Sequence, residues 1–195
     1  MRITGGTYRG RVIATPKTGD IRPTQDRVRE ALFSMLMNEV PSCRFLDLFS
    51  GSGAVGFEAL SRGAREVTFV ERDARHVATL KKNLAALGAD ATAARVVRAD
   101  AFAFASSRQA EPFDIVFADP PYALWDGRGV ETLLAALAAN GGVREGGICV
   151  AEMLSAQDAG VAVDGWRLLK EREYGKTKLV LWQFASTGTQ LHDAP

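Results

Sequence analysis

The residue types best suited to chemistry begin with a glycine-containing segment and an acidic residue that follows it. Segment 45–56 reads Phe-Leu-Asp-Leu-Phe-Ser-Gly-Ser-Gly-Ala-Val-Gly, which places three glycines where a strand is expected to turn into a helix. Glycine at such a turn lets the backbone approach a ligand closely and lets the helix pack tightly on the sheet. Glu71 lies 20 residues after Gly51, at the end of the next expected strand, where its carboxylate can accept hydrogen bonds from both ribose hydroxyls. The pattern predicts a site for a ligand that contains a nucleoside.

Two classes of nucleoside ligand fit this pattern. The spacing of Gly51, Gly53 and Gly56 is also typical of dinucleotide-binding sites, in which the helix N-terminus meets a pyrophosphate. Such sites usually have the first glycine directly after the strand, whereas here Asp47 stands at the strand tip and Leu-Phe-Ser follows it. A carboxylate at that point suits a ligand with a positive amino group and no phosphates. S-adenosylmethionine, through its methionine part, is therefore the favoured ligand, and NAD is the alternative.

A second chemical motif, Asp119-Pro120-Pro121-Tyr122, follows the expected strand 114–118. Ligands of open parallel sheets bind at the carboxyl ends of the strands, so this loop is predicted to face the same crevice as the glycine segment. The prolines fix the turn and the direction of its carbonyl groups. Asp119 and the Pro120 carbonyl can accept the two hydrogens of an exocyclic amine, which frees the nitrogen lone pair for attack, while Tyr122 stacks on the base. The motif thus predicts a site for the amino group of a nucleobase.

Strands and helices alternate along the chain in the order that produces a parallel sheet with helices on both faces. A short hairpin is expected at residues 3–13, and a helix is expected to begin at Pro23 and Thr24 and to end at Pro41. The last two strands, 166–173 and 178–184, form a hairpin and so place an antiparallel strand at one edge. The other expected elements are strands 45–49, 67–71, 95–98, 114–118 and 147–152 and helices 55–62, 73–87 and 129–139, with a helical turn after Asp100.

The composition is that of an ordinary globular protein. Of the 195 residues, 47% are hydrophobic and 24% are charged, which excludes disordered, collagen-like and disulfide-rich classes. With two cysteines and two histidines in the chain, neither a disulfide framework nor a metal centre is expected. Cys43 and Cys149 are interpreted as buried apolar residues, and the cytoplasm is the expected location. No apolar run approaches ~18 residues, so neither a membrane span nor a secretion signal is predicted.

The charge is unevenly distributed although its total is near zero. The chain has 24 basic and 23 acidic residues, yet residues 1–29 hold seven basic and two acidic ones, net +5, and the remainder has net −4. The asymmetry suggests that this leader binds a polyanion. A basic hairpin in contact with solvent explains the charge equally well, so charge alone leaves both interpretations open.

Together the motifs give the chain a family resemblance. The 119–122 loop resembles the (Asn/Asp/Ser)-Pro-Pro-(Tyr/Phe/Trp) loop of class I S-adenosylmethionine-dependent methyltransferases that methylate amino groups. The leader narrows the resemblance to the bacterial 16S ribosomal RNA guanine-N2-methyltransferases of the RsmD type. It does so through Arg2-Ile3-Thr4-Gly5-Gly6, Tyr8-Arg9-Gly10-Arg11 and the run 22–33, Arg-Pro-Thr-Gln-Asp-Arg-Val-Arg-Glu-Ala-Leu-Phe. The resemblance covers residues 1–181 and implies a Rossmann-like α/β fold, whose seven-stranded sheet is mostly parallel with an antiparallel last strand.

The resemblance also implies a division of the chain and a set of site residues. Residues 1–22 would form a basic hairpin that binds RNA, 23–184 the methyltransferase domain, and 185–195 a disordered tail. The cofactor is expected to contact Thr24, Arg27, Asp47, Phe49, Gly51, Ser52, Gly53, Glu71, Arg72, Asp100, Ala101 and Asp119. In this set Asp47 to Gly53 line the methionine end, Glu71 and Arg72 the ribose, and Asp100 and Ala101 the adenine. Asp119, Pro120 and Tyr122 would hold the guanine, while Arg2, Arg9, Arg11, Lys17, Arg22 and Arg29 would contact RNA phosphates.

The reaction implied is a direct displacement, in which guanine N2 takes the methyl group of S-adenosylmethionine and S-adenosylhomocysteine leaves. Positioning can supply most of the catalysis because positive sulfur is a good leaving group, and the base must be unpaired or flipped out. The expected partner of this monomer is 16S ribosomal RNA or an assembly intermediate of the small ribosomal subunit, with no membrane involved. Three alternatives stay open: an adenine-N6 methyltransferase of DNA, an NAD-dependent dehydrogenase and a non-catalytic RNA-binding module.

Overall fold

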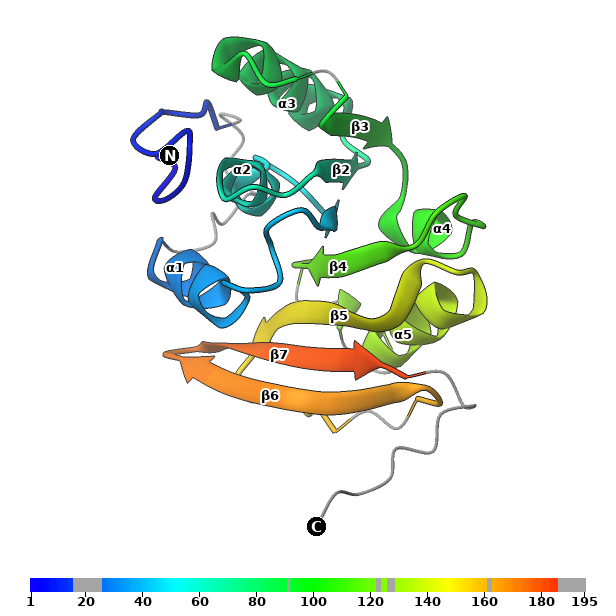
Figure 1. Ribbon diagram of the computed structural model, residues 1–195. Helices are drawn as coiled ribbons and strands as arrows, with labels where there is room; N and C mark the ends of the chain where they lie inside the picture. The colour runs from blue at the N-terminus through cyan, green and yellow to red at the C-terminus, as the bar shows by residue number, and fades with distance from the viewer. Residues whose placement is uncertain (16–25, 91, 122–123, 126–128, 161–162, 186–195) are drawn as a thin grey trace.

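A seven-stranded sheet forms the centre of the computed structural model, which describes residues 1–15, 26–90, 92–121, 124–125, 129–160 and 163–185 (Figure 1). The strand order is β3-β2-β1-β4-β5-β7-β6. The strands are β1 (Arg44–Leu48), β2 (Glu66–Glu71), β3 (Ala94–Arg98), β4 (Phe113–Ala118), β5 (Val143–Leu154), β6 (Trp166–Tyr174) and β7 (Thr177–Phe184). The helices are α1 (Asp26–Met35), α2 (Ala54–Ser61), α3 (Ala74–Leu87), α4 (Ala101–Ala105) and α5 (Gly129–Ala139).

Strand direction agrees with the expected topology, but the antiparallel strand does not form the edge as predicted: β7 lies one place further in, and β6 forms the edge. Strands β1 to β5 pair in parallel, whereas β7 is antiparallel to both of its neighbours, β5 and β6. The β6–β7 hairpin turns at Gly175, whose φ of 67° lies in the left-handed region that glycine adopts without strain. The predicted class I methyltransferase topology with an antiparallel last strand is confirmed.

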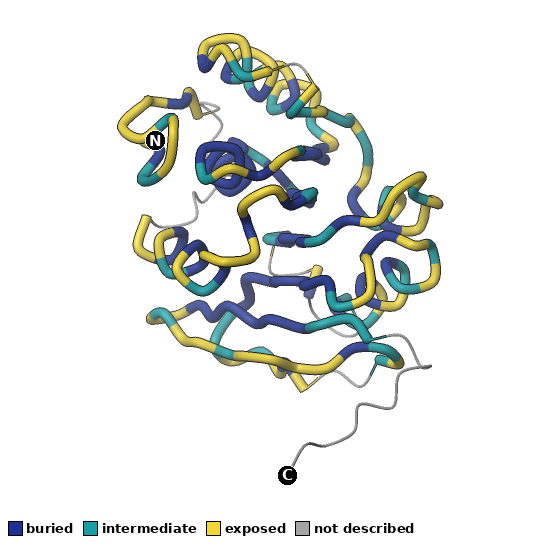
Figure 2. The backbone as a smooth tube through the Cα atoms, viewed as in Figure 1, coloured by how far each residue is buried: buried dark blue, intermediate teal, exposed yellow. Residues whose placement is uncertain are grey.

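Helices cover both faces of the sheet and create two apolar cores (Figures 1 and 2). One core lies between the sheet and the side of α1, α2 and α3, and includes Phe45, Phe69 and Phe117. The other lies on the side of α4 and α5 and includes Leu46, Val116 and Cys149. Because successive strand residues point to opposite faces, each strand contributes to both cores in alternation. In the described part of the chain no helix is long and apolar enough to cross a membrane.

The first helix is shorter than expected. Its described residues run from Asp26 to Met35 and not to Pro41, because the chain leaves the helix after Met35 and turns through residues 36–42. Ser42 adopts a φ of 65°, which redirects the backbone and brings Cys43 into the core just before β1. The predicted start at Pro23 and Thr24 lies outside the described residues. Strand β5 is longer than the predicted 147–152 on both sides.

The N-terminal loop, residues 1–15, packs on the domain. It has the predicted hairpin course, but its ladder is a single bridge between Arg2 and Val12. Ile3 and Ile13 are buried in the core on the side of α1, α2 and α3. Thr4 and Gly5 donate backbone hydrogen bonds of 2.9 and 2.8 Å to the buried Glu58 carboxylate on α2. The loop is therefore held on α2 by a buried acid as well as by apolar contacts.

Candidate active site

A cavity of about 530 Å³ lies at the carboxyl ends of β1, β2, β4 and β5. Both predicted motifs line it, as expected for the ligand-binding edge of a parallel sheet. Its walls come from the glycine loop after β1, the start of α3, the turn before α4 and the loop after β4. The lining residues are Asp47, Phe49, Ser50, Gly51, Ser52, Ala54, Val55, Val70, Glu71, Arg72, Asp73, Arg75, His76, Ala99, Asp100, Ala101, Phe117, Asp119, Pro120, Pro121, Leu124 and Glu152.

Strand register brings the acidic groups of this cavity to one face of the sheet. Asp47 on β1 is paired with Phe117 on β4, and Phe117 is paired with Val150 on β5. Two residues further along the last two strands come Asp119 and Glu152, on the same face because side chains alternate. Local sequence patterns identify Asp119, but only the register of two strands places Glu152 beside it.

Asp47 is buried and its carboxylate is tied to the helix that follows. Its side chain is 2% exposed, and Oδ2 accepts a hydrogen bond of 3.0 Å from the Gly56 N–H in the first turn of α2. Burial raises the pKa of Asp47 to about 7; the Gly56 hydrogen bond opposes this rise and the negative charge of Glu71 adds to it. A cationic group placed beside Asp47 would favour its ionised form.

The glycine loop directs its N–H groups to acceptors within the protein. Gly51 donates to Glu71 Oε2 at 2.9 Å and Gly53 donates to the Ser50 carbonyl at 2.6 Å, while the Gly56 N–H is taken by Asp47. Gly53 itself lies behind the cavity wall, with a φ of 78° and no room for a Cβ against Leu80 and Phe57. A loop that binds pyrophosphate keeps such N–H groups for the phosphates, so the observed arrangement favours a ligand without them.

Glu71, the predicted ribose ligand, is held rigidly at the end of β2. Its second oxygen, Oε1, accepts a hydrogen bond of 2.8 Å from Asp73 N–H, and His76 Nδ1 lies 3.7 Å from the same oxygen. A carboxylate has roughly four lone-pair positions. The Gly51 and Asp73 amides use two of them, so the remaining positions can accept hydrogen bonds from a diol.

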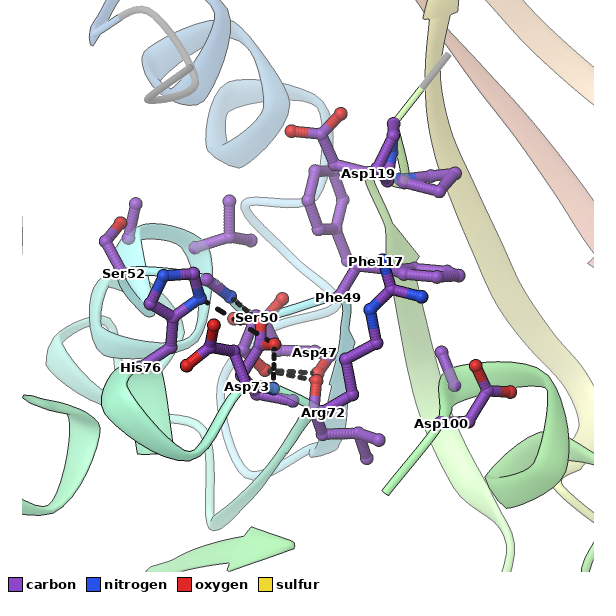
Figure 3. A pocket seen from close by; sticks show the side chains of 18 of the residues that line it. Asp47, Phe49, Ser50, Ser52, Arg72, Asp73, His76, Asp100, Phe117 and Asp119 are labelled. Carbon is purple, nitrogen blue, oxygen red and sulfur yellow. Dashed lines mark hydrogen bonds and ion pairs between the residues drawn. The ribbon is translucent and has the colours of Figure 1, made fainter. Parts of the chain in front are cut away.

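The other predicted cofactor residues surround an apolar slot. Asp100 caps α4 by accepting a hydrogen bond of 3.0 Å from Ala103 N–H, and Ala101 follows it into the wall. Phe49, whose φ is 60°, packs edge-to-face on Phe102 with 5.8 Å between ring centroids. Figure 3 draws the Arg72 side chain beside this wall. A planar ring would fit between such small and aromatic groups, with polar atoms at its rim.

The loop after β4, which contains Asp119, Pro120 and Pro121, lies at the other end of the cavity. Asp119 lies beyond Phe117 in Figure 3, away from Asp73 and Asp100. The Trp125 indole N–H donates a hydrogen bond of 2.8 Å to the Glu152 carbonyl, which ties the end of this loop to β5. Trp125 is buried and packs in the core on the side of α4 and α5.

Not every predicted site residue has a described place in the cavity. Thr24, Tyr122, Lys17 and Arg22 lie outside the described residues. Arg27 is exposed on α1 and does not line the cavity. Sequence reasoning missed Asp73, His76 and Glu152, of which Asp73 could have been recognised as the residue that caps α3. In the described ranges no three His, Cys, Asp or Glu side chains gather as a metal-binding group.

Among the candidate RNA-binding residues, Arg2, Arg9 and Arg11 are exposed on the N-terminal loop. Arg29 requires a correction, because its side chain is 1% exposed. Its guanidinium lies 3.0 Å from Asp26 and 3.4 Å from the buried Glu58, and donates a hydrogen bond of 2.9 Å to the Arg2 carbonyl. Arg29 therefore joins α1, α2 and the N-terminus and has no surface left for a phosphate.

Comparison with known proteins relates this arrangement to a family. A family model described as conserved hypothetical protein 95 matches residues 1–183. Ribosomal RNA small subunit methyltransferase D of Haemophilus influenzae is 36% identical over 94% of this chain and 93% of its own length. The solved structure of yhhF from Escherichia coli is 37% identical, with a TM-score of 0.84, and the match covers 96% of this chain and 99% of that one. SMU.776, solved in complex with SAH, matches 84% of this chain and 50% of its own with a TM-score of 0.67; at 19% identity it shows the fold alone.

Proposed function

The chain belongs to the family of ribosomal RNA small subunit methyltransferase D, described as conserved hypothetical protein 95, and from this premise we propose that it methylates the N2 amine of a guanine in 16S ribosomal RNA. The proposed cofactor is S-adenosylmethionine. The proposed substrate is the RNA itself or an assembly intermediate of the small ribosomal subunit.

The observation that supports this function best is the acidic cavity with its occupied glycine amides. Six carboxylates line it, those of Asp47, Glu71, Asp73, Asp100, Asp119 and Glu152, against the basic side chains Arg72, Arg75 and His76. Acidic walls repel a pyrophosphate and attract a ligand that carries positive charge. The Gly51 and Gly56 N–H groups already bind carboxylates of the protein. These features fit S-adenosylmethionine and argue against NAD.

Specific residues would hold the parts of the cofactor. Asp47 and the glycine loop would face the methionine end, Glu71 the ribose hydroxyls, and Asp100 with Ala101 the adenine. When bound, S-adenosylmethionine supplies a methyl group on a positively charged sulfur, which a nucleophile displaces. The protein's contribution is to align that nucleophile and exclude water, since an aligned displacement needs little further assistance.

The loop after β4 would hold the nucleophile. The Asp119 carboxylate and the Pro120 carbonyl would accept the two N2 hydrogens of guanine, which directs the nitrogen lone pair into the cavity. Asp119 is also a candidate to receive the proton that the amine loses. Exposed arginines of the N-terminal loop would bind RNA phosphates, which orient a substrate without reading its sequence.

Transfer of a labelled methyl group tests the proposal directly. The protein is incubated with methyl-tritiated S-adenosylmethionine and, in parallel, with naked 16S ribosomal RNA, small-subunit particles and DNA, and the products are digested to nucleosides. N2-methylguanosine from an RNA sample is the expected product. N6-methyladenine from the DNA sample would indicate an adenine-N6 methyltransferase of DNA instead. Binding of the cofactor and RNA without methyl transfer would favour a non-catalytic RNA-binding module.

A further inference from the structure

Glu152 is a buried acid at the active-site edge to which the proposed function gives no role. Glu152 lies near the end of β5, and only 5% of the residue is exposed. It lines the cavity together with Asp119 and Pro120. The strand neighbours Phe117 and Val150 are paired, so Asp119 and Glu152 follow them at adjacent positions on one face. Burial of a carboxylate costs free energy that hydrogen bonds or opposite charge must offset, so a buried acid in this cavity is suited to accept hydrogen bonds.

The backbone at Glu152 is fixed from two sides. Its carbonyl accepts the Trp125 indole N–H at 2.8 Å, and its residue pairs with Leu179 of the antiparallel strand β7. Both contacts hold the residue in line with the loop that contains Asp119. Glu152 therefore lines the cavity from β5, next to the strand β4 that leads into Asp119, whereas the glycine loop follows β1 and Glu71 ends β2.

The Watson–Crick edge of guanine has two donors side by side, the N2 amine and N1–H, whereas adenine has an acceptor at N1 next to its amine. An enzyme that takes a base out of the stack reads this edge by hydrogen bonds. Guanine N1 is bonded to the carbon that bears the amine, so a base whose amine is held by Asp119 and Pro120 can turn N1 toward Glu152 on β5. A carboxylate there attracts guanine N1–H and repels the N1 lone pair of adenine.

We propose that Glu152 is the residue that selects guanine, by accepting a hydrogen bond from N1–H while the Asp119 loop holds N2. This inference rests on the proposed function and assigns the base specificity of that same site. The loop that contains Asp119 suits the exocyclic amine of guanine or of adenine, and Glu152 would restrict its action to guanine.

The test compares two bases that share the N2 amine and differ at N1 and at C6, where 2-aminopurine lacks the oxygen of guanine. An RNA that spans the mapped methylation site is made with guanine or with 2-aminopurine, which has an acceptor at N1, at the target position. For the wild type we expect kcat/KM to favour guanine by at least ~10-fold, the value of one good base contact. Glu152→Gln should reduce the ratio of guanine to 2-aminopurine severalfold toward one. The Gln amide can accept a hydrogen bond from guanine N1–H and can donate one to N1 of 2-aminopurine. Glu145→Gln, an exposed acid on the same strand, is the matched control and should leave the ratio unchanged.

A purely structural role for Glu152 would lower the rates for both RNAs equally, and an unchanged ratio in Glu152→Gln overturns the proposal. The affinity of each RNA, measured without cofactor, gives a second readout of the ratio between guanine and 2-aminopurine. If the wild type methylates no guanine, the proposed function fails. The affinity ratios then still decide on Glu152, since equal ratios in wild type and variant contradict base reading.

Discussion

The Asp47 carboxylate accepts a hydrogen bond of 3.0 Å from the Gly56 N–H, nine residues further along the chain. This bond joins the tip of the central strand β1 to the first turn of α2. It places a carboxyl group at the positive end of a helix dipole, where a bound phosphate lies in dinucleotide sites. The hydrogen bond between Asp47 and Gly56 therefore closes the glycine loop and fixes the position of the carboxyl group that a ligand meets.

The ionisation of Asp47 should make stability depend on pH. Because burial raises its pKa from 3.8 to about 7, the folded protein binds more protons than the unfolded chain between about pH 4 and 7. The contribution of this residue to the free energy of unfolding should therefore fall as the pH rises through that window. Urea denaturation at a series of pH values, compared with Asp47→Asn, isolates this slope because other groups cancel. Parallel pH profiles for the two proteins would mean that Asp47 titrates normally.

Replacement of Gly56 by alanine should weaken both the fold and cofactor binding. A Cβ at this position would lie 2.3 Å from the Phe69 ring and 2.9 Å from Asp47 Oδ2, so one of the two must move. Overpacking of this kind costs about 1–3 kcal/mol. Urea denaturation should measure that loss, and calorimetry should detect weaker binding of S-adenosylhomocysteine. Full stability in Gly56→Ala would indicate that this close approach is easily relieved.

Removal of the buried Glu58 should release the N-terminal loop. Glu58→Ala removes the ion-pair partner of the buried Arg29 guanidinium and the hydrogen-bond acceptor of the Thr4 and Gly5 amides. Loss of one partner of a buried ion pair costs about 3–5 kcal/mol. Urea denaturation measures this loss, and hydrogen exchange at residues 3–13 should rise. Glu39→Ala, at an exposed position, is the control and should change stability by less than ~0.5 kcal/mol.

The exposed arginines of the N-terminal loop should contribute to RNA affinity in a salt-dependent manner. Replacing Arg9 and Arg11 by alanine removes two cations, and each phosphate contact to single-stranded RNA contributes about 0.7 to the slope of log affinity against log salt. The slope should therefore become shallower by about 1.4. The exposed Lys170 and Arg172 on the edge strand β6 provide a matched double substitution that should leave it unchanged. Equal slopes in all three proteins would mean that the leader does not touch RNA.

Local patterns in the sequence predicted most of the fold and many of the residues that line the cavity. The alternation of strands and helices, the glycine loop and Asp119-Pro120 each depend on neighbouring residues, and Cys43 and Cys149 are buried as expected. Burial raises the pKa of both thiols to about 12, which makes them unreactive.

The errors concern groups whose environment is set by distant parts of the chain. Arg29 was expected on the surface because it belongs to the basic leader, but its partner Glu58 lies 29 residues away on another helix. Glu152 joins the site only through the register of β4 and β5. Helix α1 ends early because Leu36 and Val40 both turn into the core, which no local signal indicates.

The measurement that tests the proposed chemistry most directly compares binding and transfer in Asp119→Ala. Cofactor affinity is measured by calorimetry, and methyl transfer to the RNA substrate is measured in a single turnover. We expect the affinity for S-adenosylmethionine to fall only slightly, because Asp119 is one of many expected cofactor contacts. Methyl transfer should fall by at least ~100-fold, because the amine loses its hydrogen-bond acceptor. Unchanged methyl transfer in Asp119→Ala would contradict the role of this loop in holding the guanine amine.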